Sequence, residues 1–165
     1  MKPLIFTYSH DQIFTGVKIE SSYLAERKQD GNGDGLFDAL VFDEEYLVKF
    51  RELFLDAQSR VCLALSAYMK DIPEQPDYFQ QEDFHDDKDF TIGLIMPNGF
   101  LSAMSKPIDI TIKEFLIAYI MYRWLETKLP QEAAIYFDRA QSAMDNVKRM
   151  LLNRNTPLRV KDQYY

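Results

Sequence analysis

Apolar residues between positions 46 and 68 recur every three or four residues, which is the spacing of one face of an α-helix. Asp43 is a suitable N-cap for this helix, and Glu44 and Glu45 suit its first turn because carboxylates interact favourably with the positive end of the helix dipole. The sequence therefore predicts a long helix that ends near Met69. Its apolar face is expected to comprise Tyr46, Leu47, Phe50, Leu53, Phe54, Ala57, Val61, Ala64, Leu65 and Tyr68.

Two further helices are predicted in the C-terminal half of the chain. Thr111 and Glu114 fit a capping box, and residues 115–125 after them are apolar almost all round, so this helix should be buried. We expect Trp124 to lie in the core against the long helix described above. Pro130 suits the first position of the following helix. The apolar seam of that last helix, packed against a neighbour within the domain, is expected to be Ala133, Phe137, Ala140, Met144, Val147 and Leu151.

The rest of the chain indicates shorter elements. Residues 90–96 are rich in β-forming side chains and are followed by a turn sequence, so we expect a strand there with residues 100–105 as its partner. Residues 73–89 are acidic and contain prolines, which predicts an exposed loop, and His85 within it belongs to no spaced metal motif. Residues 2–26 are expected to hold a helix with Ile13, Phe14 and Val17 on one side and Tyr23 and Leu24 further along.

Together these elements predict a mainly α fold, namely a bundle of about four helices with a small β-hairpin and an extended C-terminal arm. The helical domain is expected to span residues 1–153, with the hairpin near residues 90–105, and the arm to span residues 154–165. A chain of 165 residues is long enough to bury a sizeable core and does not require a second domain.

The stretch that follows residue 29, DGNGDGLFDALV, begins like a calcium-binding loop. Alternating Asp and Asn residues and the glycine at position 35 match the first half of an EF-hand loop. The twelfth position, which should supply a bidentate carboxylate, is Val41, so the strongest ligand is missing. We therefore favour a structural turn built from glycine and short polar residues, and the alternative is a calcium-binding helical interaction module. The candidate calcium ligands of that alternative are Asp30, Asn32, Asp34 and Asp38.

Composition places the chain among globular proteins, because 47% of its residues are hydrophobic and 14% are aromatic. Cys62 is the single cysteine, which excludes an intrachain disulfide, and we expect it in the core. No apolar stretch is long enough for a signal peptide or a membrane span, so we expect a soluble protein that is not exported. The net charge of −7 combines an acidic body with a basic end, since five basic residues and one acidic residue lie from Lys148 onward. An acidic body argues against wrapping of nucleic acid.

The sequence motifs of common enzymes are absent. The chain contains no GxGxxG, P-loop, GxSxG, HExxH or CxxC pattern, and its two histidines, His10 and His85, lie far apart. We therefore expect no enzymatic activity and no cofactor. Two other interpretations are a small enzyme without a recognisable motif, which requires a pocket with converging polar groups, and a helical adaptor of unknown pathway.

Three stretches carry a resemblance to known proteins: LFLDAQSRVCLALSAYMK, EFLIAYIMYRWLETKLPQEAAIYFDRAQSAMDNVKRMLLNR and TPLRVKDQYY. Together they resemble the head-to-tail connector, or adaptor, proteins of tailed bacteriophages, and more narrowly the ring proteins of crAss-like phages. The resemblance covers the chain from about Ser21 onward and rests on the order of its elements, but the glycine-rich loop is not part of it.

The resemblance implies a structural protein of the virion that assembles in the host cytoplasm. It implies a ring of about twelve copies below the portal that lines a section of the DNA tunnel. Its partners would be the portal protein and the adjoining connector or tail rings. DNA would pass through the ring without sequence-specific binding, and an acidic wall suits this because it repels phosphate.

The arm and the predicted hairpin are the expected partner-binding segments. The arm joins basic residues, opposite in charge to the body, to apolar and aromatic residues of the kind that dominate interfaces. The short strand is expected to have exposed edges that gain pairing partners from a neighbouring subunit or ring. The residues predicted to make these contacts are Arg154, Leu158, Arg159, Val160, Lys161, Tyr164, Tyr165, Phe90, Ile92 and Leu94.

Overall fold

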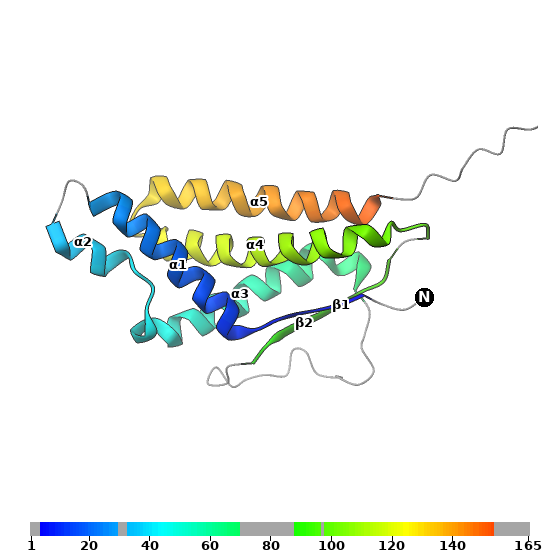
Figure 1. Ribbon diagram of the computed structural model, residues 1–165, viewed down its shortest axis with the longest axis horizontal. Helices are drawn as coiled ribbons and strands as arrows, with labels where there is room; N and C mark the ends of the chain where they lie inside the picture. Colours follow the sequence, from blue (N-terminus) through cyan, green and yellow to red (C-terminus); the bar gives the residue numbers. More distant parts are fainter. Residues whose placement is uncertain (1–3, 30–32, 70–87, 97, 154–165) are drawn as a thin grey trace, which may run out of the picture.

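The computed structural model describes residues 4–29, 33–69, 88–96 and 98–153 (Figure 1). Its strands are β1 (Leu4–Tyr8) and β2 (Phe90–Leu94), and its α-helices are α1 (His10–Gln29), α2 (Gly33–Leu40), α3 (Leu47–Leu65), α4 (Ser105–Leu125) and α5 (Pro130–Leu152). Short 3-10 helices lie before α3 (η1, Glu44–Tyr46), after it (η2, Ser66–Tyr68) and before α4 (η3, Ser102–Met104). The predicted mainly α bundle with a small antiparallel pair of strands is confirmed.

Helix α4 forms the centre of the bundle. Helix α5 runs alongside it, and α1 and α3 also pack against it (Figure 1). The composition of α4 explains this position, because it buries ten side chains spread around the helix, whereas an outer helix buries a single stripe. Gly16 allows α1 to approach α4 closely, since a Cβ atom at this position would lie 2.5 Å from Cδ1 of Ile117.

Helix α3 confirms the predicted apolar face and its cap. The Oδ1 atom of Asp43 accepts a hydrogen bond from the backbone N–H of Glu45 at 3.1 Å, and this bond fixes the start of η1. The aromatic side chain of Trp124 on α4 is buried in the same core, as predicted. The buried residues of α3 itself are Phe50, Leu53, Phe54, Ala57, Val61 and Leu65.

The two strands pair in a way that the sequence analysis missed. Strand β2 pairs antiparallel with β1, from Leu4 opposite Leu94 to Tyr8 opposite Phe90. The expected partner, residues 100–105, instead leads into η3 and the start of α4, so the prediction of a hairpin between neighbouring segments is wrong in this detail. Alternate side chains of β1 and β2 face the core, which ties the beginning of the chain to its middle.

Helix α4 begins seven residues earlier than the capping box at Thr111 suggested. Ser105 is its first residue, and Thr111 lies inside the helix, where its Oγ1 donates to the carbonyl of Pro107 at 2.8 Å. Pro107 is the sequence signal for this earlier start, because proline is tolerated in the first turn of a helix, where backbone N–H groups have no helical partner. Pro130, by contrast, opens α5 as predicted.

Three side chains are placed differently from the prediction. On α5 the buried position is Tyr136, and Phe137 is 39% exposed, because a straight helix drifts away from an ideal seven-residue repeat. Tyr23 on α1 is 64% exposed and therefore not part of the core. Cys62 is only half-buried, and burial raises the pKa of its thiol.

The glycine-rich stretch contains a helix in addition to any turn. Residues 30–32 lie outside the described part of the chain, and residues 33–40 form a helix that the turn prediction did not include. The apolar spacing explains the helix, because Leu40 is buried and Phe37 and Val41 pack on the core beside it.

Candidate interaction surfaces

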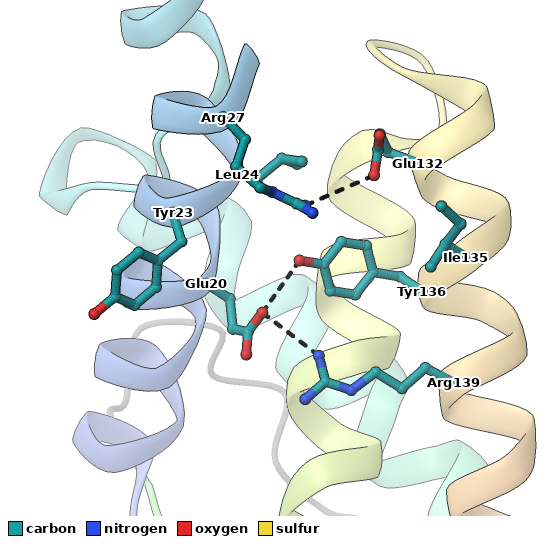
Figure 2. Close-up of a pocket in the computed structure, with 8 residues that line it drawn as sticks. All are labelled: Glu20, Tyr23, Leu24, Arg27, Glu132, Ile135, Tyr136 and Arg139. Carbon is teal, nitrogen blue, oxygen red and sulfur yellow. Dashed lines mark hydrogen bonds and ion pairs between the residues drawn. The ribbon is translucent and has the colours of Figure 1, made fainter. Parts of the chain in front are cut away.

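A groove lies between α1 and α5, both of which pack on α4 (Figure 2). Its volume is about 280 Å³, and most of its exposed lining is apolar, with the buried side chain of Leu24 in its wall. We call this feature the α1/α5 groove. Its lining residues are Glu20, Tyr23, Leu24, Arg27, Glu132, Ile135, Tyr136 and Arg139.

Polar contacts between α1 and α5 hold the two walls of the groove together. The hydroxyl of Tyr136 donates to Oε2 of Glu20 at 3.1 Å, and Arg139 contacts the same oxygen at 3.5 Å (Figure 2). At the other end, Glu132 pairs with Lys28 at 2.6 Å. Burial, together with the nearby Glu20 carboxylate, raises the pKa of Tyr136 to about 12, so this hydroxyl stays a hydrogen-bond donor at neutral pH.

The outer edge of the groove exposes apolar and basic groups. Ile135 is 60% exposed and adds an apolar side chain to this edge. The guanidinium groups of Arg27 and Arg139 are more exposed than the carboxylates that they contact, which belong to Glu132 and Glu20. A partner that approaches the groove therefore meets an apolar centre with an arginine–glutamate pair near each end (Figure 2).

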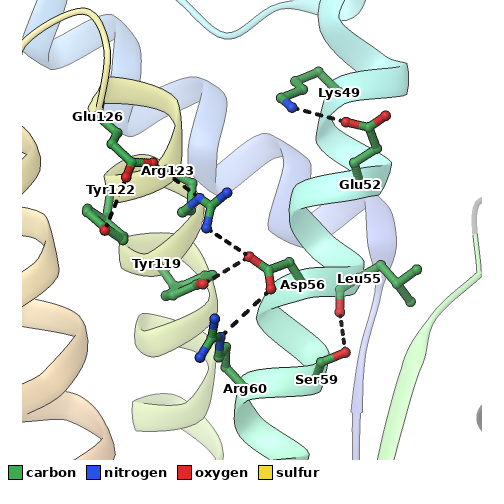
Figure 3. Close-up of polar contacts among 10 residues, drawn as sticks. All are labelled: Lys49, Glu52, Leu55, Asp56, Ser59, Arg60, Tyr119, Tyr122, Arg123 and Glu126. Carbon is green, nitrogen blue, oxygen red and sulfur yellow. Dashed lines mark hydrogen bonds and ion pairs between the residues drawn. The ribbon is translucent and has the colours of Figure 1, made fainter.

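A second apolar surface lies on α3. Val48, Leu55 and Leu63 are 58%, 40% and 71% exposed, and their spacing of seven and eight residues places them on the same broad side of the helix. They lie on the side of α3 opposite its buried face, and Leu55 points away from α4 (Figure 3). We call these three residues the α3 ridge. The sequence analysis did not predict this surface. The signal that could have revealed it is that these three apolar residues lie outside the predicted buried face of α3.

A polar network fixes α3 against α4 behind the ridge (Figure 3). Asp56 is its centre: the hydroxyl of Tyr119 donates to Oδ2 at 2.9 Å, and Arg123 lies 3.5 Å from the same oxygen. Arg60 approaches the other carboxylate oxygen at 3.8 Å. Burial and the contact with Asp56 raise the pKa of Tyr119. A carboxylate shared among three donors holds the ridge at a fixed angle to the bundle.

Helix α2 is attached to the bundle by Trp124 and Lys128. The indole Nε1 of Trp124 donates to the carbonyl of Leu40 at 2.8 Å, and the ammonium of Lys128 donates to the carbonyl of Ala39 at 2.7 Å. The same ammonium lies 3.1 Å from the centre of a Trp124 ring, and its partial burial lowers the pKa of Lys128. These contacts satisfy carbonyls at the end of α2 that have no partner within the helix.

The strand residues predicted to bind a partner are not available at the surface. Phe90, Ile92 and Leu94 are buried because β2 is paired with β1 and turns these side chains toward the core. That prediction is therefore wrong for these three residues. The predicted contacts of the arm, at Arg154, Leu158, Arg159, Val160, Lys161, Tyr164 and Tyr165, lie outside the described residues, as does the loop with His85.

The calcium candidates are not gathered into a loop by the part of the chain that the structure describes. Asp38 is exposed on α2, and the helical backbone that starts at Gly33 differs from the backbone of a calcium loop, which bends around the ion. Asp30 and Asn32 lie outside the described residues, and the Asp34 side chain is likewise not described. Within the described residues, no three His, Cys, Asp or Glu side chains are placed to hold a metal ion.

No helix in the described ranges combines the length and the hydropathy needed to cross a membrane. In comparisons with known proteins, the chain matches no family model, no curated protein and no solved structure. The α1/α5 groove and the α3 ridge are therefore the features on which a functional proposal rests.

Proposed function

We propose that this protein is a structural subunit of the connector that joins the head and the tail of a tailed bacteriophage. In this role about twelve copies form a closed ring between the portal and the tail, in the virion, and DNA passes through the ring without sequence-specific contacts. The partners are other copies of the same chain, the portal protein and adjoining rings of the neck.

The observation that carries the proposal is the pair of apolar surfaces on different helices. Single exposed apolar side chains are ordinary on a monomeric domain, whereas the α3 ridge and the edge of the α1/α5 groove each carry more than one of them. Two different apolar surfaces on one subunit are what a ring requires, because each copy contacts one neighbour on each side.

The sequence resemblance also supports the proposal, since its two longest stretches correspond to α3 with η2 and to α4 with α5. These are the elements that carry the ridge and one wall of the groove. The polar network at Asp56 and the attachment of α2 at Trp124 favour a rigid building block, which suits a subunit that is repeated in a symmetric assembly.

Negative-stain electron microscopy of the purified chain at micromolar concentration tests this proposal. The expected images are rings with a central opening, of one size, whose number increases with protein concentration. A chain that stays monomeric at every concentration, and also fails to join purified connector or portal rings of its own phage, would contradict the proposed function.

A further inference from the structure

We propose that the outer edge of β1 in one copy binds the C-terminal arm, residues 154–165, of a neighbouring copy as an added strand. This inference rests on the proposed ring and names one surface and one segment that join adjacent subunits. Addition of an extended segment to the edge of a sheet is a general mode of recognition, in which main-chain hydrogen bonds give the affinity and alternate side chains give the specificity.

The backbone pairing of β2 shows which edge of the sheet is open. Leu94 of β2 pairs with β1 on one side and forms an isolated bridge with Met69 on the other. At this bridge the N–H of Ile95 donates to the carbonyl of Tyr68 at 2.6 Å, which makes Met69 and Leu94 a non-hydrogen-bonded pair. Leu94 therefore directs its own N–H and C=O groups toward β1.

The same alternation identifies the outward-facing groups of β1. Leu4 forms a hydrogen-bonded pair with Leu94, so Ile5 and Thr7 form non-hydrogen-bonded pairs and direct their N–H and C=O groups away from β2. The contact of 3.1 Å between the hydroxyls of Thr7 and Thr91 agrees with this, because side chains lie closest at non-hydrogen-bonded pairs. Ile5 is 55% exposed and Thr7 is also exposed, so another chain can reach these backbone groups.

Strand β1 lacks two features that commonly protect an edge strand from pairing. Its sequence, LIFTY, contains no charged residue and no proline, and both are devices by which proteins keep an open edge from binding other chains. Among the described residues, the sheet has no further strand beyond β1. An apolar edge of this kind is suited to pairing with another segment in the assembly.

The arm has the sequence pattern of a strand that covers one face. Apolar and basic residues alternate over residues 158–161, LRVK, and alternation of this kind is typical of a half-buried strand. On β1 the exposed Ile5 and Thr7 likewise alternate with the buried Phe6 and Tyr8. Pairing of the basic residues with Ile5 and Thr7 places the apolar residues of the arm on the side of the core.

The position, length and charge of the arm also fit this edge. The arm follows Asn153, whose carbonyl accepts a hydrogen bond from the N–H of Leu101 at 3.4 Å, at the end of the bundle where β1 begins (Figure 1). The four residues before the alternating stretch span about 13 Å when extended, which allows the arm to reach an adjacent subunit. The arm has three basic residues and one acidic residue, whereas the whole chain has a net charge of −7, so the arm is attracted to a neighbouring copy.

Disulfide cross-linking tests the inference on the full chain. In a Cys62→Ser background, Ile5→Cys is combined with Arg159→Cys, Val160→Cys or Lys161→Cys, and each assembled protein is oxidised and separated on a denaturing gel without reductant. We expect a ladder of covalent multimers with Arg159→Cys and Lys161→Cys, because these side chains share a face with Ile5. Val160→Cys is the matched control and should give far less cross-linking, because its side chain faces the other side of the strand.

A second pair of variants tests the main-chain contact without cysteines. Ile5→Pro removes an N–H that faces away from β2, so the pairing of β1 with β2 should survive, as circular dichroism can check. Native mass spectrometry should show that this variant needs about five-fold more protein than Ile5→Ala for the same degree of assembly, because it alone loses a hydrogen bond to the arm. Equal assembly of the two folded variants would overturn the inference.

The cross-linking results separate the remaining possibilities. Disulfides within single chains, without multimers, would overturn the inference because the arm then binds its own subunit. Equal cross-linking at all three arm positions would overturn the pairing as a strand. Rings of the wild type without any cross-link would overturn the inference and leave the proposed ring in place, whereas a wild-type chain that forms no ring would overturn both.

Discussion

Replacing Trp124 with alanine is expected to lower the free energy of unfolding by about 3 to 5 kcal/mol, the range found for large aromatic residues in cores. The indole is only 7% exposed, and its ring centre lies 4.4 Å from that of Phe42 and 4.8 Å from that of Tyr46. Its Nε1 donates to the carbonyl of Leu40, and its face meets the ammonium of Lys128. Alanine removes all of these contacts and leaves a cavity where α2 joins the bundle.

Two milder variants separate the contributions. Trp124→Phe keeps much of the aromatic packing but leaves the carbonyl of Leu40 without its donor, which should cost about 1 to 3 kcal/mol. Lys128→Met keeps the aliphatic stem and removes the charge above the ring, which should cost about 0.5 to 2 kcal/mol. We expect the two substitutions to be coupled in a double-mutant cycle, because both act on the same ring and on the end of α2.

Urea unfolding followed by far-ultraviolet circular dichroism measures these differences. Circular dichroism is required because Trp124 is the single tryptophan and its fluorescence disappears in the two Trp124 variants. In the wild type this fluorescence should have the blue-shifted emission of a buried indole. A loss below about 1 kcal/mol for Trp124→Ala, or water-like emission of the wild type, would refute the reasoning about this core.

Three further perturbations test other parts of the fold. Gly16→Ala should lower the free energy of unfolding less in an Ile117→Val background than in the wild type, because valine lacks the Cδ1 atom that the new Cβ meets at 2.5 Å. Equal effects in urea unfolding would contradict the close packing of α1 on α4. The pKa of Tyr136 is raised to about 12 from an ordinary 10.0, so between these pH values the folded state keeps a proton that the unfolded state loses. The free energy of unfolding should therefore fall as the pH rises from 10 to 12, and it should fall less in Tyr136→Phe. Asp56→Asn should lower the free energy of unfolding by about 1 to 3 kcal/mol, because three donors lose a charged acceptor. Glu52→Gln on the same helix should change stability little. Equal losses in thermal unfolding for the two variants would contradict the network around Asp56.

Three of the four long helices follow from local sequence patterns. The apolar spacing of α3, the almost uniformly apolar α4 and the proline that opens α5 are features of neighbouring residues, so they can be found without knowing what the helices pack against. The Asp43 cap belongs to the same class, because its partner Glu45 is two residues away.

The strand pairing and the groove depend on contacts between distant parts of the chain. β1 meets β2 across a separation of 84 residues, for example at Thr7 and Thr91, and no turn signal links them. The polar wall of the α1/α5 groove likewise joins Glu20 to Arg139, and these two residues come together only because α1 and α5 share α4 as a neighbour. Such pairs are set by the topology of the bundle, which local periodicity does not specify.

The α3 ridge is only partly predictable from the sequence. Val48, Leu55 and Leu63 are visible in the sequence as apolar residues outside the buried stripe of α3, but their exposure is known only once the core has assembled. Scattered exposed apolar residues are ordinary, whereas three on the same side of a single helix are a candidate interface.

Native mass spectrometry of the full chain, recorded over a range of micromolar concentrations, shows whether the chain forms the proposed ring. We expect one dominant closed assembly of about twelve times the 19.4 kDa mass of the chain, with no ladder of larger species, because a closed ring leaves no contact surface free for growth. A spectrum that contains only the 19.4 kDa monomer, or an open series of ever larger oligomers, would contradict it.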